Sequence, residues 1–304
     1  MTLRPDLVVI GDALLDVTAH PATPIRPGAD VPADVRIGCG GQGANLAVRL
    51  ARSGVRVDLV CALGDDPGGT LLRKALIGEG VGLSAVRTDT TGTVVILLDQ
   101  GGERTMLSHR VAFAAGAADA VRSDVAWLAV SGYLLLEPDG GELAAALAAT
   151  PTRRALVGCT VPAEAADRWM HAAAAMRPDI VVLNRAEAAA LPPGAPDAED
   201  LPARLGERLG SGVVVTDPSG ATARLNGLTA AVRAPAAPPA TDTTGAGDAF
   251  AAALIASLLR SPWPPTTDGL EVALAAATEL ASAVAHAVGA QDRVAGEPPA
   301  SARP

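Results

Sequence analysis

Short runs of Val, Ile and Leu alternate along this chain with longer segments rich in Ala and Leu. The short runs predict strands at Leu7–Ile10, Val55–Ala62, Val125–Val130, Ala155–Val157, Ile180–Leu183 and Val213–Val215. The longer segments predict helices at Ala44–Arg52, Gly69–Ile77, Gly141–Ala148, Ala163–Met176, Pro202–Leu209 and Ala249–Arg260. Apolar strands that alternate with helices are typical of βαβ units on a mainly parallel sheet covered on both faces. We therefore expect an α/β fold with a helical layer on each side of the sheet.

Two regions interrupt this alternation. Residues 17–37 contain four prolines and end in a short strand-like run, Asp34–Ile37. Residues 92–108 have the pattern of a hairpin, with two β-rich runs joined by Asp99-Gln100-Gly101-Gly102. We expect both regions to form a small β lid over the functional edge of the sheet, inserted into a single domain of residues 1–292. The alternative is a pair of irregular surface insertions. Residues 293–304 are expected to be a flexible tail.

Composition and charge narrow the classes of function. The chain has 304 residues and a net charge of −9, and Lys74 is its only lysine, so a basic surface for nucleic acid is not expected. Cys39, Cys61 and Cys159 are widely spaced and odd in number, which predicts reduced side chains in a cytoplasmic protein. The first apolar run, Leu7–Ile10, is far too short for a signal peptide or a membrane span.

The most informative segment is DTTGAGDAF, residues 242–250. Its turn, Gly245-Ala246-Gly247, comes just before a predicted helix, and the N–H groups at a helix start form a pocket for an anion. Asp248 lies beside this pocket, where its charge would repel a bound anion. One explanation is that Asp248 takes a proton from a hydroxyl that attacks a phosphorus atom held in the pocket. On this segment alone, a purely structural role at the helix start is the alternative.

A second glycine-rich segment, Gly38–Gly43, matches the GxGxxG pattern of dinucleotide-binding proteins, and Asp58 lies 20 residues beyond Gly38. The surrounding sequence argues against a dehydrogenase. A full strand, Leu7–Ile10, already precedes the motif, whose own short strand belongs to the proline-rich insertion. Asp58 is also followed by further apolar residues, whereas the acid of the dinucleotide motif ends its strand.

Both glycine-rich segments, in this order and spacing, resemble the ribokinase family of carbohydrate kinases, also called the PfkB family. GGQGANLAVRLARSG at 40–54, followed by LVCALGDDPGG at 59–69, is similar to the first signature of the family, and DTTGAGDAF to the second. The segments GDALLD at 11–16, SGYLLLE at 131–137, NRAE at 184–187 and AVGAQD at 287–292 match further elements. The resemblance implies a ribokinase-like fold and the transfer of a phosphoryl group to a sugar.

The resemblance also implies a set of substrate-binding residues. Asp16 follows the first strand, where open α/β sheets place ligand groups, and its carboxylate can accept hydrogen bonds from two sugar hydroxyls. A turn cap is the alternative for Asp16. Gly40 and Gly41 let a sugar approach the main chain, and Asn45 offers both a donor and an acceptor. Glu137 matches a substrate-contacting acid, at a position that varies within the family.

On the donor side, the resemblance implies ATP and Mg²⁺. Asn184 and Glu187 are implied to hold Mg²⁺ through water, which suits an ion that keeps most of its hydration shell. A structural helix start is the alternative for this pair. Thr216 and Gly220 are implied to line the nucleotide site, although Pro218 replaces a glycine of the family there and removes an N–H donor.

A monovalent cation is a further implication of the resemblance. Asp242 and the main chain at Thr244 match the cation site that many members carry, which predicts stimulation by K⁺. Lids of this family often pair, so a homodimer through the lid is expected, with a monomer as the alternative.

Together these residues predict an ATP-dependent kinase that phosphorylates a hydroxymethyl group of a small sugar. Asp248 is expected to act as the base, and the amides of Gly245, Ala246 and Gly247 to stabilise the transferring phosphoryl group. The alternatives are a nucleoside kinase of the same family and a catalytically silent sensor of sugar or nucleotide.

Overall fold

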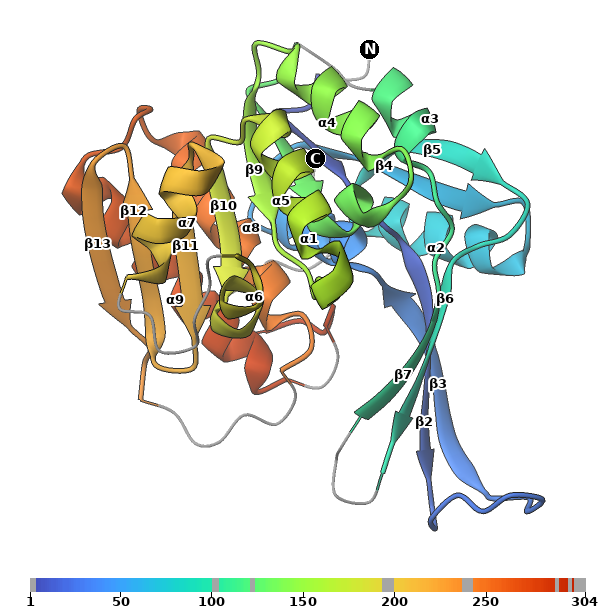
Figure 1. Cartoon of the computed structure of the whole chain (residues 1–304). Helices are drawn as coiled ribbons and strands as arrows, with labels where there is room; N and C mark the ends of the chain where they lie inside the picture. Colours follow the sequence, from blue (N-terminus) through green and yellow to red (C-terminus); the bar gives the residue numbers. More distant parts are fainter. Residues whose placement is uncertain are drawn as a thin grey trace.

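The strands of the protein form two sheets, one in the body of the molecule and one that projects from it (Figure 1). The computed structural model describes residues 4–99, 104–120, 124–192, 200–236, 243–287, 290–294 and 297. In spatial order, the strands of the nine-stranded body sheet are β13 (Leu228–Arg233), β12 (Gly220–Leu225), β11 (Gly212–Asp217), β10 (Ile180–Asn184), β9 (Arg153–Val157), β8 (Trp127–Ser131), β1 (Leu7–Ile10), β4 (Val57–Gly64) and β5 (Gly82–Thr88).

Neighbouring strands from β11 to β5 run parallel, and only β12 and β13 are antiparallel to their neighbours. The order reverses at β1, which has β4 on one side and β8 on the other. Such a switch point opens a crevice at the carboxyl ends of the strands, where open α/β sheets bind ligands. The residues that follow β1 and β8 therefore reach the same crevice.

Helices cover both faces of the body sheet, as expected from the apolar runs. The helices are α1 (Gln42–Arg52), α2 (Pro67–Gly78), α3 (Ala114–Asp119), α4 (Gly140–Ala148), α5 (Ala166–Met176), α6 (Arg185–Ala190), α7 (Leu201–Leu209), α8 (Ala246–Arg260) and α9 (Thr267–Ala285). Successive residues of β1 point to opposite sides: Leu7 and Val9 belong to one buried cluster, and Val8 and Ile10 to the other. The prediction of an α/β fold is confirmed.

The second sheet is built from the two segments that were predicted to form a lid, and we call it the lid; its closure over the site stays a prediction. Its strands, in spatial order, are β3 (Ala33–Gly40), β2 (Leu14–Pro21), β6 (Thr93–Leu98) and β7 (Arg104–His109). Strands β2 and β3 extend a few residues beyond the predicted segment 17–37 at both ends, whereas β6 and β7 nearly coincide with the predicted segment 92–108. Irregular insertions are thereby excluded.

The GxGxxG segment lies at the junction of lid and body. Gly38 and Gly40 belong to the lid strand β3, and α1 begins at Gln42. The glycines therefore do not form the turn between a body strand and its helix, which a dinucleotide fingerprint requires.

The described part of the predicted tail differs from expectation. Glu297 is almost buried and forms ion pairs with Arg49 and Arg52 of α1, at 2.7 and 3.2 Å. Arg293 pairs with Glu79 at 2.8 Å. The sequence of this segment did not reveal Arg293 and Glu297 as ion-pair partners, because the charged residues that they contact lie more than 200 residues earlier. Among the described residues, no helix is long and apolar enough to cross a membrane.

Candidate active site

The glycine-rich turn and Asp248 lie at the start of α8, which begins three residues earlier than predicted. Gly245 caps the helix with a φ of 77°, in the left-handed region that favours glycine, and Ala246 is the first helical residue. A Cβ atom at Gly245 would lie 2.6 Å from the Cβ of Ala290, so the C-terminal segment packs directly on the turn. Asp248 falls in the first helical turn, beside the N–H groups that would bind an anion.

Asp248 is held by Asn45, whose Nδ2 donates to its Oδ2 at 2.8 Å. The pKa of Asp248 is raised to about 7, mainly by burial and to a smaller extent by the carboxylates of Asp12 and Glu187. The hydrogen bond from Asn45 and the charge of Arg49 act in the opposite direction. A carboxyl group with a pKa near neutrality is suited to proton transfer at physiological pH.

Asp248 lines a small cavity of about 100 Å³ together with Gly245 and Gly247 of the turn. Asn184, the last residue of β10, and Glu187 of α6 also line this cavity. The side chains of these two residues bond reciprocally to each other's backbone N–H at 2.8 and 2.9 Å, a capping box that starts α6. The structural alternative for Asn184 and Glu187, a helix start, is thus present, and the same two residues also line the cavity that contains Asp248.

Gln42 closes the wall of this cavity, although the sequence did not single it out. Its Nε2 donates to the carbonyl of Gly158 at 2.7 Å, and its Oε1 accepts from the Ser131 hydroxyl at 2.6 Å. Gln42 therefore ties the start of α1 to the ends of β8 and β9. These bonds fix the position of the helix that carries Asn45.

A larger cavity of about 730 Å³ adjoins the small one, because Asn184, Thr216 and Gly247 line both. Thr216 and Gly220 lie where the sequence predicts, at the hairpin between β11 and β12. The far wall consists of Phe250 and of residues on and just after α9, among them Thr278, Ser282 and His286. The size of this larger cavity, and its contact with the glycine-rich turn, suit a nucleoside triphosphate.

Asp16 and Gly40 lie against each other at the base of the lid. A Cβ atom at Gly40 would overlap the Asp16 carboxylate, so glycine is required for this approach. Burial raises the pKa of Asp16 to about 6; the charge of Asp12 acts in the same direction and that of Arg110 opposes it. Gly41 is also constrained, because its φ is 92° and a Cβ atom there would lie 2.7 Å from the Asp12 carbonyl oxygen.

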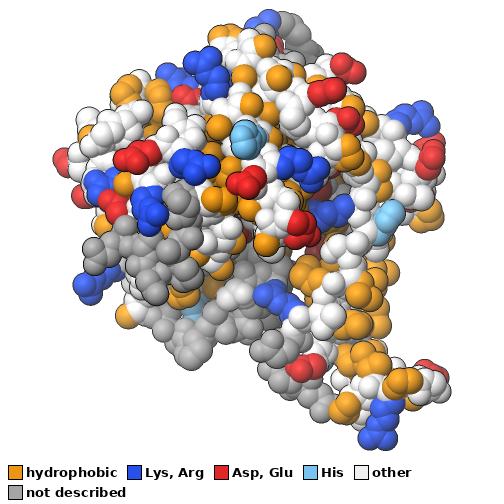
Figure 2. Space-filling model, in the orientation of Figure 1, with side chains coloured by type: hydrophobic (Ala, Val, Ile, Leu, Met, Phe, Trp, Pro, Cys, Tyr) orange, Lys and Arg blue, Asp and Glu red, His pale blue; other side chains and the backbone are white. Residues whose placement is uncertain are grey.

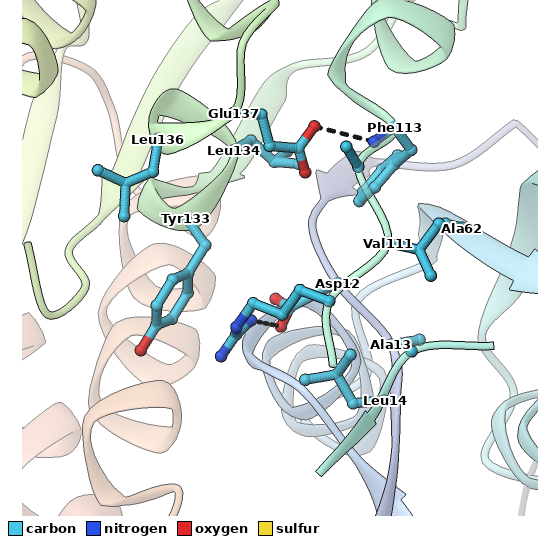
Figure 3. Close-up of a pocket in the computed structure, with 13 residues that line it drawn as sticks. Asp12, Ala13, Leu14, Ala62, Val111, Phe113, Tyr133, Leu134, Leu136 and Glu137 are labelled. Atoms are coloured by element: carbon cyan, nitrogen blue, oxygen red, sulfur yellow. Dashed lines mark hydrogen bonds and ion pairs between the residues drawn. The ribbon is translucent and has the colours of Figure 1, made fainter. Parts of the chain in front are cut away.

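A third cavity, of about 180 Å³, lies between the start of the lid and the body (Figure 3). Arg110, which follows the last lid strand, forms an ion pair with Asp12, which follows β1. The Arg110 guanidinium also lies 3.8 Å from the centre of the Tyr133 ring. The sequence did not single out these three residues, although Asp12 belongs to the GDALLD segment.

Glu137 lines the same cavity, but its carboxylate is turned toward the start of α3 (Figure 3). Its Oε2 accepts from the backbone N–H groups of Phe113 and Ala114 at 2.8 and 2.7 Å. Oε2 of Glu137 therefore holds the segment that follows Arg110. A role of Glu137 in binding substrate stays a prediction, and it would fall to Oε1.

The predicted monovalent-cation site is described only in part. Asp242 lies outside the described residues. The Thr244 hydroxyl accepts a hydrogen bond from Arg104 of the lid strand β7, and Thr243 accepts a second from the same guanidinium at 3.2 Å. The lid thus contacts the segment just before the glycine-rich turn.

Comparison with known proteins identifies the family. The family model for "pfkB family carbohydrate kinase" matches residues 4–295. The chain belongs to the PfkB family of carbohydrate kinases. It is 32% identical over 280 residues to a fructokinase from Klebsiella pneumoniae, a match that covers 83% of this chain and 87% of the relative.

Solved structures confirm the ribokinase-like fold of this PfkB kinase. Ribokinase from Thermotoga maritima aligns with a TM-score of 0.77 at 21% identity, over 95% of each chain. Ribokinase from Cryptococcus neoformans in complex with ADP aligns with a TM-score of 0.69 at 21% identity, over 95% of this chain and 96% of that one. Membership makes the protein a phosphotransferase with an alcohol group as acceptor.

The residues around the small cavity fit a hydrated Mg²⁺. Burial raises the pKa of Glu187, and a cation beside its carboxylate would compensate the cost of keeping it ionised. One Glu187 oxygen, Oε1, takes no part in the capping box. Among the described residues no group of three or more His, Cys, Asp or Glu side chains could enclose a metal ion. When bound, Mg²⁺ would neutralise phosphate charge, with Asn184 and Glu187 holding its water ligands.

The first prediction concerns the carboxylate of Asp248. We expect Asp248→Asn to lower kcat by about 10²–10⁴-fold, because the amide cannot accept a proton from the attacking hydroxyl. The variant should fold, since the new side-chain oxygen can still accept the bond from Asn45. Steady-state kinetics measure kcat, and thermal unfolding shows whether the variant is folded. A kcat within threefold of the parent enzyme would contradict the assignment of Asp248 as the base.

The second prediction concerns pH. Since the pKa of Asp248 is raised to about 7, kcat/KM should rise with pH through that value as the carboxylate ionises. The free energy of unfolding should change in the opposite direction. Asp248 binds its proton more tightly in the folded state than in the unfolded state, so the stability that its protonated form contributes is lost as pH rises through about 7. Relative to the parent enzyme, Asp248→Asn should therefore become more stable to heat as the pH rises from 5 to 8. If the difference in melting temperature between Asp248→Asn and the parent enzyme does not vary with pH, the pKa of Asp248 is not raised.

Proposed function

We propose that this PfkB kinase is ATP-dependent and phosphorylates a hydroxymethyl group of a neutral sugar. The observation that supports this most strongly is the adjacency of two cavities. The small cavity contains Asp248 and the anion-binding turn, and it shares Asn184, Thr216 and Gly247 with the larger, nucleotide-sized cavity. A triphosphate lying in the larger cavity would place its terminal phosphate beside Asp248.

The proposed mechanism uses groups that the chain itself supplies. Asp248 accepts the proton of the sugar hydroxyl as that oxygen attacks the terminal phosphorus. The N–H groups at the start of α8 stabilise negative charge on the transferring group, since they point at it without reorganisation. The lid, which contacts the segment before this turn through Arg104, excludes water that would otherwise be phosphorylated instead of the sugar.

We place the sugar in the third cavity, of about 180 Å³, and call it the sugar cavity. The proposal of a neutral acceptor follows from the charges in and beside this cavity. The charge of Asp12 raises the pKa of both Asp16 and Asp248. Arg110 also reaches this region, but it is already paired with Asp12. An anionic sugar would therefore meet more negative than positive charge, whereas the hydroxyls of a neutral sugar would donate to these carboxylates.

The size of the sugar cavity supports a single sugar over a nucleoside. Its volume is about 180 Å³, small beside the cavity proposed for the nucleotide. The relative from Klebsiella pneumoniae bears the name fructokinase, which makes fructose the first sugar to test. A silent sensor is the less favoured alternative, because binding alone requires no proton acceptor next to an anion pocket.

The third prediction is the outcome of an acceptor panel with ATP, Mg²⁺ and K⁺. Fructose or ribose should give the highest kcat/KM, and adenosine and a ketodeoxy sugar acid should be at least about tenfold poorer. Formation of ADP measures turnover, and Asp16→Asn should raise the KM of the sugar more than that of ATP. Preference for the acid would overturn the neutral acceptor, and tight binding of one sugar without turnover would establish a sensor.

Replacement of K⁺ by tetramethylammonium tests the cation site, where a loss of activity is expected.

We also propose that two chains pair through the outer face of the lid. The registers of the lid strands place seven apolar side chains on one face: Val17, Ala19, Val35, Ile37, Val95, Leu97 and Leu107. Val35, Ile37 and Leu107 are each more than half exposed. Hydrophobic side chains gather along the lid in Figure 2. The opposite face carries Asp16 and the buried side chains of Val94 and Ile96, so it faces the body. A continuous apolar face that spans a whole sheet is typical of an interface.

The fourth prediction tests this pairing. Ile37→Glu should convert a dimer into a monomer, because it buries a charge in the centre of the apolar face. Val272→Glu is the matched control, since Val272 is 69% exposed and lies on α9, away from the lid. Size-exclusion chromatography with light scattering gives the mass of each. A parent chain that elutes as a monomer, or an Ile37→Glu variant that remains dimeric, would contradict pairing through this face.

A further inference from the structure

Gln291 contacts the shell of the proposed base from the C-terminal segment. Its Nε2 donates to Oδ1 of Asn45 at 2.9 Å, and Nδ2 of Asn45 donates to Oδ2 of Asp248 at 2.8 Å. Three side chains from distant parts of the sequence thus form one chain of hydrogen bonds that ends on Asp248. The sequence motifs assign no role to Gln291.

The direction of these bonds follows from the chemistry of a carboxamide. The Asn45 amide has an oxygen that only accepts and a nitrogen that only donates. Because Gln291 donates to the oxygen, the nitrogen of Asn45 must face Asp248. A reversed amide would place its oxygen against the carboxylate, where two acceptors repel each other.

The backbone around Gln291 is held by a buried arginine on the same helix as Asn45. Nη2 of Arg49 donates to the carbonyls of Ala290 and Asp292, at 2.8 and 2.9 Å, on either side of Gln291. Nη1 of Arg49 pairs with Glu297 at 2.7 Å. Arg49 lies one helical turn beyond Asn45, so one face of α1 fixes both the amide and the segment that orients it.

We infer that Gln291 is a positioning residue, which acts through Asn45 to hold one oxygen of Asp248 and leave the other for the sugar hydroxyl. This inference rests on the proposed function, in which Asp248 accepts the proton. It also gives the C-terminal segment a part in catalysis, although that segment contributes no atom to the three cavities.

The fifth prediction compares two substitutions of similar size. Gln291→Met removes the donor but lets the Asn45 nitrogen still face Asp248, so kcat should fall about five- to tenfold. Gln291→Glu keeps the shape but offers an acceptor, which favours the reversed Asn45 amide, so kcat should fall by about a hundredfold. The KM of ATP should change by less than about threefold in both variants, since Gln291 lines neither the small cavity nor the nucleotide-sized one. A role in packing alone predicts the reverse order, because glutamate is the closer match in shape.

Asp292→Asn is the control, because Asp292 is exposed and adjacent, and only its backbone carbonyl binds Arg49. Its kcat should equal that of the parent enzyme, with thermal unfolding confirming that all three variants are folded at the assay temperature. An equal loss in Asp292→Asn, a kcat that is unchanged in Gln291→Glu, or a larger loss in Gln291→Met than in Gln291→Glu would each overturn the inference. Asp248→Asn, assayed in parallel, separates the two proposals: if it is inactive while Gln291→Glu is fully active, only the positioning role fails.

Discussion

A carboxylate that takes a proton near neutral pH must be poorly solvated and yet held in one orientation. Asp248 meets both conditions, because burial raises its pKa to about 7 while Asn45 binds one of its oxygens at 2.8 Å. The nearby carboxylates of Asp12 and Glu187 would make the ionised form still less stable. The hydrogen bond from Asn45 and the buried charge of Arg49 therefore stabilise the ionised form of Asp248 in surroundings that otherwise disfavour it. The rest of the site is arranged around this balance.

The approach of α1 to β1 makes the arrangement possible. A Cβ atom at Gly43 would lie 2.4 Å from the carbonyl carbon of Gly11, so the helix and the strand touch through their backbones. This contact brings Gln42 and Asn45 to the carboxyl ends of the strands, at the point where the order of the sheet reverses. The glycines of the first signature are thus explained by close packing as well as by the approach of a substrate.

Much of the fold was accessible from the sequence, because its strands are buried on both faces and read as uninterrupted apolar runs. The two edge strands, β5 and β13, and the neighbouring strand β12 were not predicted, since partial exposure mixes polar residues into their patterns. Among the residues that line the small cavity, Asp248, Thr216 and Glu187 were singled out by the sequence because they lie in motifs. Gln291, Arg110 and Gln42 act through partners that lie 89 to 246 residues away in the sequence, and no local pattern reveals such pairs.

The donor side shows how a departure from the family pattern can be accommodated by the rest of the fold. Pro218 has no N–H to offer a nucleotide, and the turn that contains it is tightened by Asp217, whose Oδ1 accepts from the Ser219 backbone at 2.7 Å. The loop is therefore the tight end of the hairpin between β11 and β12. What it contributes is shape: with Phe250 and the side chains of α9, it encloses the larger cavity. On the proposed function, selection among nucleotide donors would depend on the fit of the base against α9, while the turn that precedes Asp248 would bind the phosphates.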